Sequence, residues 1–314
     1  MSDPIIRPLT FTDLDGALRL STVVGWNQRL DDWRMLLRLA PAGAFAARLD
    51  SHDACIVGTA IGIDYGSFAW IAMMLVDPAY RGRGLGSRLL EAAIDAMPSS
   101  LPIRLDATPM GRPLYQRYGF EDETTLSRYA RLKPRAPSEP RTPSEPRAPS
   151  ASRASSIVRS LTDADMAVVV EQDRETFSGT RGAVLEWAFH SAPQYAYVVR
   201  NDEGPVDYCL GRQGRLFDQI GPVVARDDDI AHALVSAALA AAGDRSVVVD
   251  AFDPSTGSGS PRAMSRGESR STFTAALRDD GFVVQRPLVR MCRPGRDGLQ
   301  AVPKEFAILG PEFA

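Results

Sequence analysis

A proline at every third position through the middle of the chain limits what this region can form. The segment 133–156, KPRAPSEPRTPSEPRAPSASRASS, has its prolines at residues 134, 137, 140, 143, 146 and 149. Polyproline II has three residues per turn, so all six rings would line one edge of an extended segment with too little apolar surface to fold. We interpret it as a semi-rigid spacer, and binding of its PxxP pattern by another protein is the alternative. The chain is thereby divided into two domains, residues 1–132 and 157–314.

The two domains resemble each other in sequence. IRPLTFTDL at residues 6–14 matches VRSLTDADM at residues 158–166, and YGFEDETTLSRYAR matches DGFVVQRPLVRMCR near the end of each domain. Matches that keep their order along the chain indicate an internal duplication with insertions.

The stretch RGRGLGSRLL, residues 81–90, predicts an anion site in the first domain. WIAMMLVDPAY before it is typical of a buried strand, and apolar residues at helical spacing follow from Leu85 to Met97. The first turn of such a helix has unpaired N–H groups, and glycines let an anion approach them closely. Gly86 is followed by Ser87 and Arg88, which excludes a Walker loop and weakens a dinucleotide fingerprint. An ordinary glycine turn beside a basic patch is the remaining alternative.

The pattern Arg81-x-x-Gly84-x-Gly86 resembles the pyrophosphate loop of the GCN5-related N-acetyltransferase (GNAT) family, and the resemblance covers nearly the whole first domain. It implies an α/β fold class in which each of two GNAT-like domains has a mixed, mostly antiparallel sheet flanked by helices. It also implies acetyl-coenzyme A as the acyl donor, and from the few histidines and cysteines we expect no metal. The residues that it assigns to the pantetheine arm and the pyrophosphate are Met74, Leu75, Val76, Arg81, Gly82, Arg83, Gly84, Leu85, Gly86 and Ser87.

The second domain departs from this pattern. It has RDDDIAHAL where the first domain has YRGRGLGSRLL. Aspartates at a helix start complement the helix dipole but repel a bound pyrophosphate. We therefore expect a degenerate second domain, with a helix capped by acids, that does not bind coenzyme A.

Two catalytic candidates follow from the resemblance. Tyr115 lies four residues before Gly119-Phe120, as in the LYxxxGF segment of the family, whose tyrosine protonates the departing thiolate of coenzyme A; a core aromatic is the alternative. Asp106, at the end of its strand, matches a position where some members have an acidic general base. Asp250 has the equivalent place in the second domain, so a structural role for both aspartates stays open.

Trp26 and Asn27 are the candidate acceptor-binding residues. The first helices are expected to form the acceptor wall, where aromatic surface and the carboxylate of Asp32 would suit a cation. The segment DDWRMLLRLAP also predicts an amphipathic helix with Trp33 in the core.

The sequence thus predicts an N-acetyltransferase that transfers acetyl from acetyl-coenzyme A to a primary amine of a small metabolite or amino acid derivative, directly in a ternary complex. The alternatives are acetylation of a protein N-terminus or lysine, and an acyl-coenzyme A sensor without turnover. A net charge of −3 does not suggest a nucleic-acid partner, and three scattered cysteines with three histidines indicate neither disulfides nor a zinc site. No export signal or apolar span is present in the sequence, so we expect a cytoplasmic protein. The sequence indicates no oligomeric state.

Overall fold

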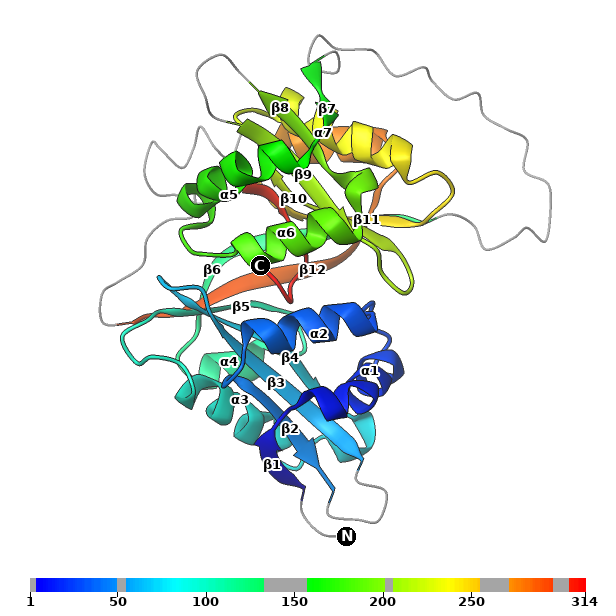
Figure 1. Ribbon diagram of the computed structural model, residues 1–314. Coiled ribbons are helices and arrows are strands. Elements are labelled where there is room, and N and C mark those ends of the chain that lie inside the picture. The colour runs from blue at the N-terminus through cyan, green and yellow to red at the C-terminus, as the bar shows by residue number, and fades with distance from the viewer. Residues whose placement is uncertain (1–3, 50–54, 133–156, 201–205, 255–270, 296–304) are drawn as a thin grey trace, which may run out of the picture.

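Strands from both domains join one sheet in the computed structural model, which describes residues 4–49, 55–132, 157–200, 206–254, 271–295 and 305–314. The predicted proline spacer at 133–156 lies outside these residues. The sheet has 13 strands in the order β1-β2-β3-β4-β5-β12-β6-β11-β13-β10-β9-β8-β7 (Figure 1). Nearly all neighbouring strands are antiparallel, while β4 with β5 and β10 with β11 are parallel. The predicted mixed, mostly antiparallel sheet is confirmed.

The strands of the first domain are β1 (Ile5–Pro8), β2 (Ala44–Arg48), β3 (Ile56–Asp64), β4 (Ala69–Val76), β5 (Ile103–Ala107) and β6 (Glu121–Arg131). Those of the second are β7 (Arg159–Ser160), β8 (Tyr197–Arg200), β9 (Val206–Arg212), β10 (Asp218–Val224), β11 (Val247–Phe252), β12 (Val283–Arg293) and β13 (Glu305–Ile308).

The two domains exchange their long strands. β12 of the second domain lies between β5 and β6 of the first, and β6 lies between β12 and β11 (Figure 1). We expected a sheet in each domain; the structure joins the two sheets, because each long strand completes the sheet of the other domain. The division of the chain at residue 132 stays a prediction, and the sheet crosses it.

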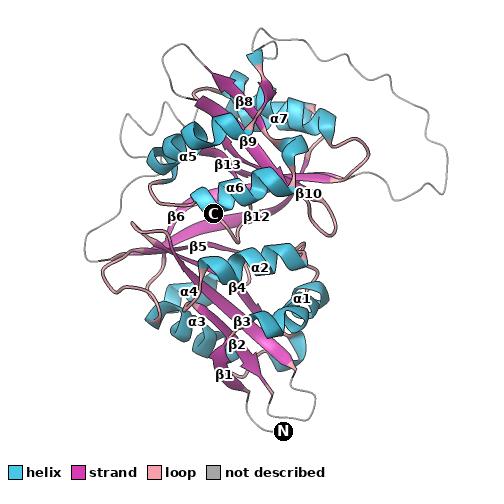
Figure 2. Ribbon diagram, viewed as in Figure 1, coloured by secondary structure: helices cyan, strands magenta, loops and turns pink. Residues whose placement is uncertain are grey.

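Helices flank this sheet on both faces (Figure 2), and seven of those in the described part of the chain are α-helices with labels in Figure 1. They are α1 (Leu14–Val23), α2 (Leu30–Leu39), α3 (Leu85–Asp95), α4 (Arg112–Arg117), α5 (Asp163–Phe177), α6 (Gly182–Ser191) and α7 (Asp228–Ala241). Residues 271–279 are also helical, and short 3-10 turns occupy Phe11–Asp13, Pro78–Tyr80 and Pro193–Tyr195. No helix in the described part of the chain is long and apolar enough to cross a membrane.

The core is divided between the two faces of the sheet. Residues of α1, α2, α5 and α6 share one apolar cluster, which also contains Trp70 and Val198. Their neighbours Ile71 and Val199 belong to other clusters, with α3 and with α7 respectively. Successive strand residues point to opposite faces, so α1, α2, α5 and α6 cover one face and α3 and α7 cover the other. α2 of the first domain and α6 of the second consequently lie side by side (Figure 1).

Candidate functional site

Strand β4 separates from β5 halfway along its length. The two strands pair only at Ala69 with Ile103 and Trp70 with Arg104, although both continue further. Met73 has a φ of +50°, and the register of β4 against β3 shifts at this bulge. The hydroxyl of Thr59 donates to the Met73 carbonyl at 2.8 Å and so holds the bulge. No strand pairs with Met74 and Leu75 on the β5 side within the described residues, which leaves their backbone groups open to a ligand.

The predicted glycine loop lies just after this opening and leads into α3. Gly82 and Gly84 have φ values of +76° and +73°, and Gly84 is the N-cap residue directly before α3. A Cβ added at either glycine would meet no atom within 4 Å, so the space in front of the loop is open. The first turn of α3 contains no acidic residue. Free amides, the helix dipole and open space together fit a pyrophosphate group.

Two arginine side chains of this loop lie at its surface. Arg81 donates from Nε to the Val76 carbonyl at 3.0 Å, and Arg83 lies over the Tyr80 ring at 5.4 Å. Leu85 is buried in the α3 core, so it contributes only backbone to the loop. The roles assigned to the residues from Met74 to Val76 and from Arg81 to Ser87 stay predictions, which this geometry supports.

Tyr115 lies in α4, on the face of the sheet that carries α3. Its ring packs against Phe120 at 6.0 Å between centroids, within the cluster that contains Leu85 and Ala107. The hydroxyl makes no hydrogen bond with any residue that the structure describes. Burial raises the pKa of Tyr115 above its usual value, so the phenol keeps its proton at neutral pH. The geometry accommodates both interpretations, because the ring is core and the hydroxyl is uncommitted.

Asp106 is held by an arginine of the other domain. Arg290 of β12 donates from Nε and Nη2 to its two carboxylate oxygens at 2.9 and 3.0 Å, and both side chains are buried. Arg290 also lies over the rings of Trp70 and Phe252. Burial raises the pKa of Asp106, and the charge of Arg290 opposes that rise. A carboxylate occupied in this way favours the structural role over that of a general base.

Asp250 makes the equivalent pair with the domains interchanged. Arg128 of β6 binds its two oxygens at 2.7 and 2.6 Å. Each aspartate therefore lies in the sheet of one domain and each arginine comes from the long strand of the other. The matching segments LSRYAR and LVRMCR contain these arginines at equivalent positions. This match indicated the duplication, but not which aspartate each arginine would bind.

The corresponding opening in the second domain is filled. β10 also shifts its register, between Ile220 and Val223, but β13 lies between β10 and β11 and pairs with both. A Cβ on Gly221 would lie 2.0 Å from the Ile308 carbonyl, so only glycine allows this approach. The chain's own strand occupies the position that is open beside Met74. This strand, Glu305–Ile308, was not predicted from the sequence.

The acidic start of α7 is capped as expected. Asp227 accepts a hydrogen bond from the Ile230 amide at 2.9 Å, which is an ordinary helix cap. Asp228 accepts one from the Phe273 amide at 3.0 Å. These carboxylates occupy the helix start that an anion would need.

The structure places Asn27 against the second domain. Its Nδ2 donates to the Phe217 carbonyl at 2.9 Å, and its Oδ1 accepts from the amides of Leu216 and Phe217. The Trp26 carbonyl accepts from Arg215 at 2.9 Å. Both residues fasten the α1–α2 loop to the β9–β10 hairpin, and their acceptor-binding role stays a prediction that these contacts do not favour for Asn27. Trp33 is fully buried, as expected for the core.

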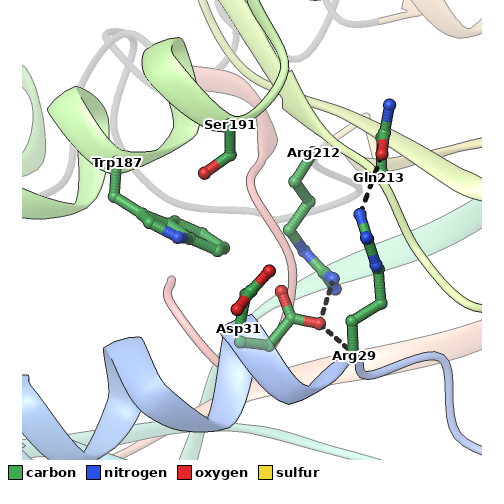
Figure 3. A pocket seen from close by; sticks show the side chains of 7 residues that line it. Arg29, Asp31, Trp187, Ser191, Arg212 and Gln213 are labelled. Atoms are coloured by element: carbon green, nitrogen blue, oxygen red, sulfur yellow. Dashed lines mark hydrogen bonds and ion pairs between the residues drawn. The ribbon is translucent and has the colours of Figure 1, made fainter.

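Polar side chains that the sequence did not single out line a cavity beside this seam. It lies between α2, α6 and the end of β9, and its lining includes Asp32, Trp187 and Arg212 (Figure 3). Of these residues, Asp32 alone was named in the sequence analysis. The others come from segments far apart in the chain, which only the fold brings together. In the described residues, no group of histidine, cysteine or acidic side chains is arranged to hold a metal ion.

Comparisons with known proteins agree with this fold. Models of the acetyltransferase (GNAT) domain match residues 42–122 and, separately, residues 169–258. The uncharacterized N-acetyltransferase YitH of Bacillus subtilis is 25% identical over 225 residues, which are 71% of this chain and 73% of that protein.

Two solved structures share the fold over nearly the whole chain. A putative acetyltransferase from Pyrococcus horikoshii has a TM-score of 0.71 at 21% identity and covers 99% of this chain and 96% of its own. A GCN5-related N-acetyltransferase from Sphaerobacter thermophilus has a TM-score of 0.57 at 19% identity and covers 93% of this chain and 96% of its own. The two domain matches together span more than half of the chain, which therefore belongs to the GNAT acyltransferases and carries two domains of that family in tandem.

Proposed function

We propose that the first domain transfers an acetyl group from acetyl-coenzyme A to a primary amine of a small molecule. The observation that carries the proposal is the contrast between the two openings. Beside Met74 the strand is open and leads to a glycine loop, whereas the second-domain opening is filled by β13 and followed by an acid-capped helix. One donor-binding site per chain is the consequence.

The chain's own groups would act on the two ends of the reaction. Acetyl-coenzyme A supplies the acetyl group as an activated thioester. The loop amides would hold its pyrophosphate, and the open backbone of Met74 and Leu75 would align its pantetheine arm. As the amine nitrogen bonds to the carbonyl carbon and the carbon–sulfur bond breaks, the Tyr115 hydroxyl would give its proton to the sulfur. The proton lost by the amine leaves to solvent, which also reprotonates Tyr115.

A small acceptor is favoured over a peptide because the second domain covers the opposite face. Trp70 donates from Nε1 to the Pro311 carbonyl at 3.1 Å, and the Tyr65 hydroxyl donates to the Phe313 carbonyl at 3.0 Å. α6 and the C-terminal segment with Pro311 and Phe313 cover the face of the sheet on which α1 and α2 lie. A long peptide would have to displace these contacts, whereas a small amine would not.

The experiment is an amine panel incubated with the full-length protein and acetyl-coenzyme A while release of the coenzyme A thiol is followed. We expect turnover with at least one small amine and none with Gly84→Glu, whose side chain would occupy the open space at the loop. Acetylation of peptide N-termini or lysines alone would replace the small-amine proposal with the peptide alternative. Donor binding without turnover of any amine or peptide would favour the sensor alternative.

A further inference from the structure

A cavity of about 170 Å³ lies where the two domains meet. It lies between the first turn of α2 from one domain and α6 and the end of β9 from the other, and it opens to the surface at Arg29, Asp31 and Ser191 (Figure 3). A cavity of about 150 Å³ holds a benzene-sized molecule, so this one has room for a small metabolite. Its lining is polar and includes charges of both signs.

One side of the cavity carries carboxylates and an indole. Asp32 is 1% exposed, and its Oδ2 accepts from the Arg29 amide at 2.6 Å and from Arg212 Nη1 at 3.1 Å. Its Oδ1 receives no hydrogen bond from any residue that the structure describes. The Trp187 indole extends from α6 toward α2 (Figure 3), and its ring is 5.1 Å from that of Phe313. A carboxylate oxygen without a hydrogen-bond partner, in a lining that also contains an indole ring, suits an ammonium group.

Asp31 adds a second carboxylate on this side. It belongs to the first turn of α2, and its only ion-pair partner among the described residues is the exposed Arg34 at 2.7 Å. Burial raises the pKa of Asp32 to about 6, so this carboxylate is mostly ionised at neutral pH.

The other side carries a cation without an acidic partner. Arg29 donates from Nη1 to Gln213 Oε1 at 2.8 Å, and the two side chains lie together in Figure 3. It makes no ion pair with any described residue. Arg212, by contrast, is already engaged by the buried carboxylates of Asp32 and Glu312. The Arg29 guanidinium is therefore the cation that remains for a ligand carboxylate.

We propose that this cavity binds a small amino carboxylate, whose ammonium group contacts Asp31, Asp32 and the Trp187 indole and whose carboxylate contacts Arg29. The proposal concerns binding alone and stands or falls independently of acetyl transfer. It also gives the second domain a role in ligand binding, because Trp187 and Gln213 come from that domain. The ligand bridges the two domains at the seam where Asn27 also bonds the β9–β10 hairpin.

Titration calorimetry on the full-length protein tests the site with straight-chain amino carboxylates from glycine to 6-aminohexanoate. Butylamine and butyrate are the probes with a single charge. We expect one amino carboxylate to bind at least tenfold more tightly than either singly charged probe, and the best chain length to report the separation of the two charged sides. Absence of binding by every amino carboxylate at 10 mM, or equal binding of butylamine, overturns the proposal.

Matched variants assign the charges. Asp31→Asn and Arg29→Gln should each weaken binding of the best amino carboxylate at least fivefold. Trp187→Leu should weaken it as well, because it removes the aromatic ring that contacts the ammonium group. Asp15→Asn and Arg38→Gln change the same residue types at exposed positions of α1 and α2, and should leave binding unchanged. Unaltered affinity in both Asp31→Asn and Arg29→Gln, with melting temperatures as in the wild type, overturns the proposal.

Discussion

The Tyr115 side chain combines a buried ring with an uncommitted hydroxyl. A buried tyrosine ordinarily finds a hydrogen-bond partner, and here none of the described residues supplies one. The neutral phenol, whose pKa is raised by burial, suits a group that must hold a proton until a thiolate forms.

We expect Tyr115→Phe to lower kcat by roughly 10²- to 10⁴-fold with an accepted amine, because the departing sulfur loses its proton donor. The dissociation constant for acetyl-coenzyme A should change little, since the hydroxyl makes no contact that the fold needs. Steady-state kinetics and calorimetry measure the two quantities. Tyr118→Phe is the control, because among the described residues its hydroxyl donates only to the exposed Glu91. A loss below threefold in Tyr115→Phe would remove this residue from the mechanism.

Asp106 presents the opposite case, a carboxylate whose oxygens are both occupied. We expect Asp106→Asn and Arg290→Met each to destabilise the protein by about 3–5 kcal/mol, because each leaves one buried charge without its partner. The double variant Asp106→Leu/Arg290→Met should recover most of that loss and keep its activity. Denaturant unfolding and amine turnover check both parts. A stable but inactive double variant would instead give Asp106 a catalytic role.

At the scale of elements, the strand–loop–helix unit from β4 to α3 is the part of the fold that the proposed function assigns to donor binding. Its sequence signals are local: a buried strand, glycines at positive φ, and an apolar stripe. The strand, the loop and the helix could therefore be predicted from the sequence. β13 could not, because Glu305–Ile308 is a short strand whose partners β10 and β11 lie far before it in the chain.

Gly84→Glu should abolish acetyl-coenzyme A binding, because a charged side chain would enter the open space before α3. Any non-glycine residue at a φ of +73° also adds strain of about 1–2 kcal/mol. Gly243→Glu is the matched control, since Gly243 has a φ of +57° and equally open surroundings after α7 in the second domain. Calorimetry should find one equivalent of donor bound to the control and to the wild type. Two equivalents in the wild type would mean that β13 does not close the second opening.

At the scale of the whole molecule, the exchange of β6 and β12 is the feature that sequence analysis did not predict. The two strands contain equivalent residues, Leu126 and Arg128 in one and Leu288 and Arg290 in the other. Either strand would therefore satisfy the apolar pattern and the aspartate of either domain. Which copy pairs with which sheet depends on the arrangement of the entire chain, so no local pattern reveals it. The duplication, the fold class and the glycine loop before α3 were predictable because each depends on the local order of residues.

The exchange predicts that the domains cannot be separated without unfolding. β12 pairs with β5 from Arg293 to Val289 and with β6 along nearly its whole length, and β6 pairs with β11 over six residues from Leu126 to Arg131. Without residues 157–314, β5 and β6 would lose the strand that lies between them. Asp106 would also lose its ion-pair partner Arg290. We expect fragment 1–132 alone to be unfolded or aggregated.

A protease site inserted near residue 144 tests this on the intact fold. After cleavage, the two fragments should elute together on size exclusion in native buffer and unfold in one transition, because the crossed strands hold them rather than the covalent connection. They should separate only in denaturant, and mixing them on refolding should restore the complex. As a control, the uncut chain with the same insertion should unfold at the same temperature as the wild type. Fragments that separate in native buffer, or a fragment 1–132 that folds and binds acetyl-coenzyme A alone, would contradict the exchange, since two sheets that were each complete would have no need of the other's strand.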